Sequence, residues 1–398
     1  MQQLAGSRTV LVLVAVTFLL LLGASISEPI RPLFIVGVGA STLELGLVMA
    51  LQSLVSVATR IPASALSGRL GRRRLVAFSI ALSVATTVMF AFVYSPIVFY
   101  PLVSLSALSW SVFSPISLVV VSDHSGPSTR GAVMGIYFSA IGAAMFFGPL
   151  LCSFLTLFIG FRELFIVSAC FPLIALVLFV LKTSRAEMDV VAPSSNPGEE
   201  RGGGTWESLA RIFRVRNVAA VCYAQVAFAL SYGVFSTLFA IYAEGTLGLA
   251  APVIALLFSF RALNNVLTRL PAGRMSDRIG RRRPVILSHA IVVAVFVVLP
   301  FVKDPALLAL LLAVYGVGWG MRVAPDSALV SESVPPEDRP LALALLMTMF
   351  DVGFTLGSLF AGATTAFLSI PIMFLLCAPI LLSGLISLVF LTTETLTR

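Results

Sequence analysis

The chain of 398 residues is 59% hydrophobic and only 11% charged, and its mean hydropathy is +1.04. A soluble domain is about 25% charged and about 45–50% apolar, so this composition excludes a water-soluble protein. The net charge of +8 does not indicate nucleic-acid binding, because the sequence offers no soluble face that combines basic and aromatic residues.

Twelve apolar stretches follow one another along the chain, and each is long enough as a helix to cross a hydrocarbon layer of about 30 Å. Alternating segments of about ten residues, which mark membrane β-barrels, do not occur. We therefore expect an all-α membrane protein with twelve transmembrane helices. The predicted spans are residues 9–30, 43–66, 75–94, 97–121, 131–158, 162–182, 217–241, 250–273, 284–302, 305–330, 340–367 and 371–391.

Lysine and arginine gather in every second loop and in the middle of the chain. Cytoplasmic loops are enriched in these residues, so we expect a multi-pass protein of the cell (plasma) membrane with both termini in the cytoplasm. The first apolar run follows Arg8 and is too long for the core of a secretory signal, which predicts that it remains as the first span.

An internal duplication organises the sequence. Residues 59–74 (TRIPASALSGRLGRRR) and 268–283 (TRLPAGRMSDRIGRRR) share ten of sixteen positions at an offset of 209, and the same offset pairs Trp110 with Trp319. Six spans return the chain to its starting side, so the repeat predicts two parallel, pseudo-symmetric six-helix bundles. We place the bundles at residues 1–182 and 217–398.

The linker, residues 183–216, is rich in glycine, proline and serine, a composition typical of flexible connections. Within it, Trp206, Leu209, Ile212 and Phe213 recur at helical spacing beside three arginines. This pattern predicts a short amphipathic helix on the cytoplasmic membrane surface. The alternative is a simple extension of the seventh span.

The duplicated segment contains two basic loops, at residues 69–74 and 273–283. The second reads GRMSDRIGRRR and resembles the signature G-x-x-x-D-R-x-G-R-R of the major facilitator superfamily. In the first, Ser64 stands where the signature has its leading glycine, and Gly68 stands where it has the aspartate. Gly148-Pro149 resembles the antiporter motif of that family. The predicted gating residues are Arg69, Gly71, Arg72, Arg73, Gly273, Asp277, Arg278, Gly280, Arg281 and Arg282.

This resemblance implies a secondary transporter that works by alternating access. Asp277 is then expected to form an ion pair, or to contact a helix N-terminus, in a way that breaks when the two halves rock. The alternative is that the arginines serve only as a topology signal.

Ionisable residues inside spans are costly and mark functional sites. Arg60 and Arg269 are repeat mates, which favours shared mechanics or snorkelling over substrate contact. Arg322 and Asp326 lie four residues apart and either neutralise each other or serve the transport path. In the family, spans one, four, seven and ten line that path. The predicted substrate and proton pathway comprises Glu28, Arg31, Arg261, Arg322, Asp326, Asp351, Tyr232 and Trp319.

We expect proton-coupled efflux of amphipathic, drug-like compounds, with lipid bilayer, a small-molecule substrate and H⁺ as partners of a monomer. The alternative is proton-coupled import or exchange of an anionic small solute, such as a carboxylate or sugar derivative. The sequence has no phosphate-binding GxxxxGK[ST] loop and too few histidines, His124 and His289, for a catalytic triad or metal site. We therefore expect no enzyme, no cofactor and no metal; an intramembrane enzyme and a non-transporting scaffold are the other classes considered.

Overall fold

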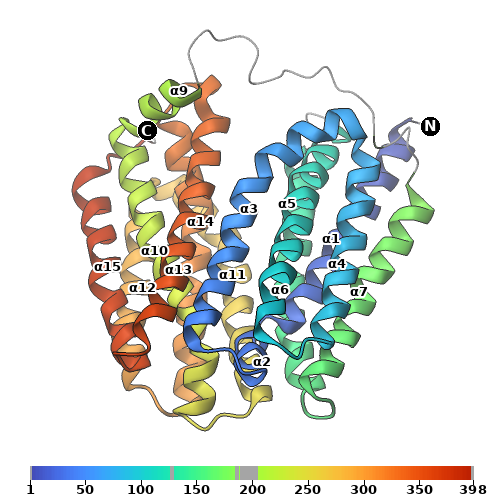
Figure 1. Cartoon of the computed structure of the whole chain (residues 1–398). Coiled ribbons are helices and arrows are strands. Elements are labelled where there is room, and N and C mark those ends of the chain that lie inside the picture. Colours follow the sequence, from blue (N-terminus) through green and yellow to red (C-terminus); the bar gives the residue numbers. More distant parts are fainter. Residues whose placement is uncertain (1, 126–129, 184–187, 189–204, 396–398) are drawn as a thin grey trace. The chain divides into compact units, whose positions relative to one another are not determined.

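The computed structural model describes residues 2–125, 130–183, 188 and 205–395, and in these ranges every regular element is a helix (Figure 1). The helices before the linker are α1 (Gln2–Ser27), α2 (Arg31–Gly37), α3 (Thr42–Leu70), α4 (Arg72–Ala91), η1 (Pro96–Val98), α5 (Phe99–Asp123), α6 (Arg130–Leu155) and α7 (Phe161–Lys182). Those after it are α9 (Thr205–Phe213), α10 (Arg216–Gly245), α11 (Ala251–Ile279), α12 (Arg282–Val298), η2 (Leu299–Phe301), α13 (Pro305–Glu332), η3 (Pro336–Asp338), α14 (Arg339–Thr364) and α15 (Ile370–Leu391).

Twelve of these helices are long and apolar enough to cross a membrane, and each overlaps one of the twelve predicted spans. The prediction of an all-α protein with twelve transmembrane helices is confirmed. The short helix α2 was not predicted; it lies between the first two spans and begins with Arg31-Pro32, where proline is well tolerated because the first helical N–H has no intrahelical partner.

The contacts between residues divide the chain into two compact units. Unit 1 comprises Met1–Ser194 with Leu249–Ser259, and unit 2 comprises Ser195–Gly248 with Phe260–Arg398. In unit 1, α1 packs against α6 and α7, and α4 against α5 and α7; in unit 2, α10 packs against α14 and α15, and α12 against α13 and α15. The two halves of the chain thus repeat the same pairings of helices.

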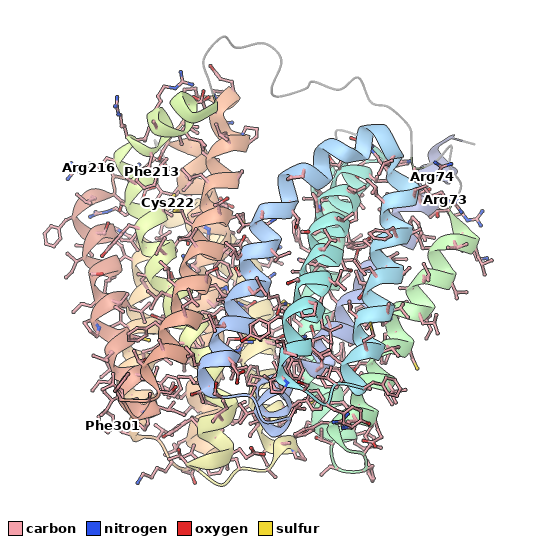
Figure 2. All side chains as sticks on the ribbon, in the orientation of Figure 1. Arg73, Arg74, Phe213, Arg216, Cys222 and Phe301 are labelled. Carbon is pink, nitrogen blue, oxygen red and sulfur yellow. The ribbon has the colours of Figure 1, made fainter. Side chains whose placement is uncertain are left out.

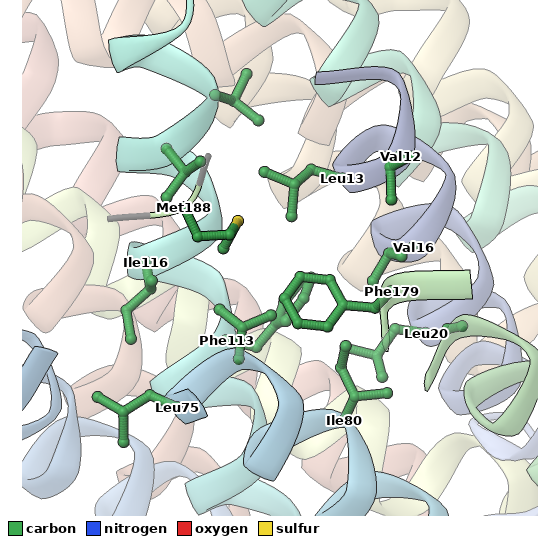
Figure 3. Packing of buried hydrophobic residues seen from close by; sticks show 14 of the residues in the cluster. Val12, Leu13, Val16, Leu20, Leu75, Ile80, Phe113, Ile116, Phe179 and Met188 are labelled. Carbon is green, nitrogen blue, oxygen red and sulfur yellow. The ribbon is translucent and has the colours of Figure 1, made fainter. Parts of the chain in front are cut away.

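The core of unit 1 is formed by aliphatic and phenylalanine side chains from α1, α4, α5 and α7 (Figure 3). Leu13 and Val16 of α1, Phe113 of α5 and Phe179 of α7 are fully buried. Lipid is as apolar as these side chains, so the hydrophobic effect does not drive helices together inside a membrane. Close van der Waals packing of this kind holds them together instead.

Two glycines at repeat-related positions allow close helix crossings. A Cβ atom at Gly148 of α6 would lie 2.4 Å from the Cβ of Ser25 in α1, and one at Gly357 of α14 would lie 2.0 Å from the carbonyl oxygen of Leu230 in α10. No side chain fits at such distances, so glycine is required for the backbones to approach. Gly148, the glycine of the antiporter-like pair, therefore has a packing role that the other half shares.

The predicted linker contains the helix α9, which lies at the end of unit 2 where α10 begins; Figure 2 shows Phe213 and Arg216 at that end and Phe301 at the opposite one. Ile212 is buried in a core cluster with Val218 and Val334. The guanidinium of Arg211 pairs with the Asp338 carboxylate at 3.3 Å. Part of the apolar face of α9 thus packs on protein, and the side chain of Trp206 lies outside the described residues.

Candidate functional site

The two basic loops make the same turn. Gly71 follows α3 with φ +83°, and Gly280 follows α11 with φ +98°. These angles lie in a region that L side chains rarely adopt, so glycine suits both positions. Each turn leads directly into the next helix, α4 or α12, and places an arginine at the start of that helix.

The arginine that directly follows each of these glycines forms an ion pair, and the pair occurs in both halves. Arg72 lies 2.7 Å from the carboxylate of Asp123 at the end of α5. Its repeat mate Arg281 lies 2.9 Å from the carboxylate of Glu332 at the end of α13, and Asp123 and Glu332 are also 209 positions apart. Each pair therefore ties the third span of its half to the fourth.

The next arginine in each loop caps the sixth span of its half. Arg73, labelled at the first turn of α4 in Figure 2, donates to the carbonyl oxygens of Thr183 at 3.1 Å and Val180 at 3.2 Å, at the end of α7. Arg282 donates to the carbonyl oxygen of Val389 and, at 3.3 Å, to the hydroxyl of Thr392, at the end of α15. Cations at a helix C-terminus satisfy carbonyls that have no intrahelical partner. The arginines thus have two distinct structural tasks.

Asp277 joins the network of the second half alone. Its exposed carboxylate accepts from Arg281, which also bonds Glu332. Partial burial acts to lower the pKa of Arg281, but the hydrogen bonds and charges of Glu332 and Asp277 outweigh it and raise that pKa. In the first half the position of Asp277 is occupied by Gly68, so only the second loop has this additional carboxylate.

Among the described side chains, the remaining predicted gating residues Gly273 and Arg278 have no comparable contacts. Gly273 lies in α11 with room for a Cβ, which would meet Ala324 at 3.8 Å. Arg278 is exposed and lines an open hollow with Arg274 and Pro271. The side chain of Arg69 lies outside the described residues.

In unit 1 the structure brings Glu28 and Arg31 together at the junction between α1 and α2. The negative charge of Glu28 attracts the positive charge of Arg31. Arg31 donates to the amide oxygen of Gln52 at 3.3 Å and to the hydroxyl of Ser27 at 3.4 Å, and its guanidinium carbon lies 5.8 Å from the ring centroid of Phe90. This is a partly paired cation beside an aromatic ring.

In unit 2 the structure buries a charge pair on α13. Arg322 and Asp326 lie 2.8 Å apart, and their side chains are 3% and 5% exposed. Arg322 also donates to the amide oxygen of Gln225 on α10, and its guanidinium carbon lies 4.0 Å from the ring centroid of Phe228. The Nη1 of Arg322 and the Oδ1 of Asp326 are buried and have no hydrogen-bond partner among the described residues, so the pair retains unused hydrogen-bonding capacity.

An aromatic cluster lies beside this pair. Trp319 of α13 is 4.5 Å from Tyr232 of α10 and 5.6 Å from Phe228, measured between ring centroids. The buried guanidinium of Arg261 on α11 lies 5.1 Å from the Trp319 ring and 5.6 Å from the Tyr232 ring, within the range of a cation–π attraction. The predicted residues Arg261, Tyr232 and Trp319 therefore form one cluster, which Phe228 joins to Arg322.

Three other intramembrane ionisable residues lie on α14, α11 and α3. Asp351 is half-buried on α14, next to Phe350, whose ring contacts Tyr232 at 6.1 Å. Arg269 donates to the side-chain oxygen of Asn265, one turn earlier, at 2.7 Å. Its repeat mate Arg60 bonds the hydroxyl of Ser56, also one turn earlier, at 3.4 Å. The two mates are held in the same way, on their own helices.

Several contacts that build the site have no signal in the sequence. Gln225, on the seventh span, could be expected to supply a hydrogen bond or to pack between helices, but nothing in its spacing indicates Arg322 as its partner. His289, fully buried on α12, contacts the carbonyl oxygen of Ala224 at 3.3 Å through Nε2. Glu394 contacts the second basic loop from beyond the last span, where hydropathy gives no information about contacts.

Comparison with known proteins gives consistent matches. The family model of the Major Facilitator Superfamily matches residues 13–232 and 221–398. An uncharacterized MFS-type transporter of Methanocaldococcus jannaschii is 22% identical over 92% of this chain and 94% of its own length. The multi-drug resistance efflux pump PmrA of Streptococcus pneumoniae is 21% identical over 87% of this chain and 86% of its own.

Solved structures share the fold across the chain. The nucleoside transporter NupG superposes with a TM-score of 0.82 at 12% identity, covering 97% of this chain and all of its own. A bacterial homolog of the human lysosomal transporter Spinster gives a TM-score of 0.75 at 15% identity, covering 97% and 95% of the two chains. These identities support a common fold and carry no information about the substrate.

Proposed function

Since the chain belongs to the major facilitator superfamily and is a multi-pass membrane transporter rather than an enzyme, we propose that it exports small amphipathic, drug-like compounds in exchange for protons by alternating access. The solute and the proton then share a path, and the two six-helix halves that alternate its access are residues 1–182 and 217–398. The similarity to the efflux pump PmrA over most of both chains supports export.

The observation that carries the proposal is the buried Arg322–Asp326 pair beside Phe228 and Trp319. A carboxylate that loses contact with its arginine in a low-dielectric site favours protonation, and one that regains contact favours release. Asp326 and Arg322 have no ionisable repeat mates, since Ser117 and Phe113 stand there. An asymmetric ion pair of this kind suits a proton-binding step, and the rings beside it suit flat, apolar solutes.

The test uses purified protein in proteoliposomes with an imposed pH gradient and ethidium, a fluorescent lipophilic cation, as the probe. Wild-type protein is expected to move ethidium against its gradient when protons flow the other way. Asp326→Asn removes the exchangeable proton, so it is expected to abolish gradient-driven accumulation while ethidium exchange across equal pH persists. Accumulation driven as well by Asp326→Asn as by wild type would refute the role of Asp326.

A second candidate is the import or exchange of an anionic solute with protons. It is favoured by Arg261, a cation buried among aromatic rings, whose repeat mate is the neutral Gln52. Arg261→Ala and Arg322→Ala separate the candidates, because both changes should weaken binding of an anion such as benzoate. If benzoate affinity survives both changes, the anion candidate fails.

We further propose that the protein is a monomer in the plasma membrane and that both of its termini lie in the cytoplasm. The orientation follows from charge, since the basic loops and the linker carry most of the lysine and arginine and such residues favour the cytoplasmic side. On this orientation the ion pairs Arg72–Asp123 and Arg281–Glu332 keep each half rigid at its cytoplasmic end while the halves rock. Labelling of single cysteines at Lys182 and Phe301 with an impermeant maleimide in intact cells tests the orientation: only the cysteine at position 301 should react.

A further inference from the structure

The segment Thr392–Thr395, which follows the last span, reaches the second basic loop. The carboxylate of Glu394 accepts the backbone N–H of Arg281 at 2.7 Å and of Arg282 at 3.2 Å. These groups begin α12 and have no intrahelical partner. A Cβ atom at Gly280 would lie 2.2 Å from Glu394 Oε2, so the glycine leaves the space that the carboxylate fills.

The same segment also bonds the ends of two other helices. The backbone N–H of Thr393 donates to the side-chain oxygen of Asn217 at 2.8 Å, and Asn217 Nδ2 donates to the hydroxyl of Ser333 at 2.9 Å. The hydroxyl of Thr395 donates to the carboxylate of Glu332 at 2.7 Å. Residues 392–395 thus connect the starts of α10 and α12 with the end of α13.

The sequence of this segment differs between the two halves of the repeat. Up to the sixth span the halves agree, because Arg73 and Arg282 bond repeat-related groups. Beyond it the sequences diverge: 209 positions before Glu394 stands Arg185, and 209 positions before Asn217 stands Arg8. A carboxylate at this position of the repeat is therefore present in the second half only.

We propose that Glu394 is a positioning residue for the ion pair of the second basic loop: by bonding the start of α12 it holds the loop in the conformation in which Arg281 reaches Glu332. This inference rests on the proposed role of that ion pair in transport. It assigns a positioning task to the end of the described chain.

The first experiment measures the thermal unfolding of the full-length chain in detergent and does not depend on the transported solute. Glu394→Gln is expected to lower Tm by about 2–4 °C, whereas the matched control Glu244→Gln, at an exposed position near the end of α10, leaves it unchanged. In the double variant Arg281→Ala/Glu394→Gln, Tm is expected to fall by clearly less than the sum of the losses in the two single variants, because both changes act on one loop.

Glu332→Gln supplies a second background in case Arg281→Ala does not fold. An unchanged Tm for Glu394→Gln, or strict additivity in a cycle with either background, would overturn the proposal. The second experiment measures ethidium transport in proteoliposomes, where Glu394→Gln is expected to lower kcat about tenfold with KM unchanged, and to slow neither background further. A wild-type protein that moves no ethidium would count against the proposed function and leave the Tm cycles as the decision on Glu394.

Discussion

Removal of one member of the buried charge pair in unit 2 should destabilise the protein more than removal of both. Asp326→Asn keeps the size of the side chain but leaves Arg322 charged at a site where its side chain is 3% exposed. Breaking a buried pair on one side costs about 3–5 kcal/mol, because the remaining charge is uncompensated. For a unit of this size, about 2–4 °C of Tm corresponds to each kcal/mol, so the expected fall is about 6–20 °C.

The double variant Arg322→Met/Asp326→Leu removes both charges. What remains is the side-chain oxygen of Gln225, which loses the donor Arg322, at a cost of about 1–3 kcal/mol. The midpoints of the two ranges are about 4 and about 2 kcal/mol, so the double variant should recover about half of the Tm lost in Asp326→Asn. The assay is thermal unfolding of the full chain in detergent, followed by tryptophan fluorescence. A double variant that is no more stable than Asp326→Asn would refute the reasoning that an unpaired buried charge dominates.

Three further changes test the packing and the repeated contacts. Gly357→Ala should cost about 1–3 kcal/mol of stability, because the added Cβ would lie 2.0 Å from a backbone oxygen. The control Gly135→Ala, at a position where nothing lies within 4 Å of the added Cβ, should leave Tm unchanged or raise it. Equal losses of Tm in the two variants would contradict this. Ser41→Ala removes the capping box at the start of α3 and should cost about 1 kcal/mol, seen as faster amide hydrogen exchange confined to the first turn of that helix. Arg72→Ala should lower Tm, and Asp123→Ala added to it should lower Tm little further; full additivity would show that the 2.7 Å pair is energetically unimportant.

The sequence predicted the helices well because in a membrane nearly all the information lies in the length of an apolar run. The boundaries were less certain: predicted span 43–66 belongs to a helix that continues to Leu70, and predicted span 9–30 belongs to a helix that ends at Ser27. Polar residues at helix ends follow capping and loop geometry, which hydropathy does not report. The helix α2 escaped prediction for the same reason.

The internal repeat predicted more of the residues that form the site than any single motif did. The offset of 209 relates Asp123 to Glu332 and Arg72 to Arg281, and the structure joins these residues into two equivalent ion pairs. Contacts that break the repeat, such as those of Gln225 and Glu394, depend on side chains far apart in the sequence. No periodic pattern encodes them, so they emerge only from the folded chain.

The central claim, that two halves expose one path to each side of the membrane in turn, is tested most directly by electron spin-resonance distances in the full chain in lipid nanodiscs, on a background without the native cysteines. One pair of spin labels is placed at Lys182 and Arg278, on the predicted cytoplasmic side, and another at Tyr94 and Phe301, on the opposite side; all four positions are exposed. The account predicts that a change from pH 8 to pH 6 lengthens one distance and shortens the other. Two distances that lengthen together, or that both stay fixed while transport proceeds, would contradict it.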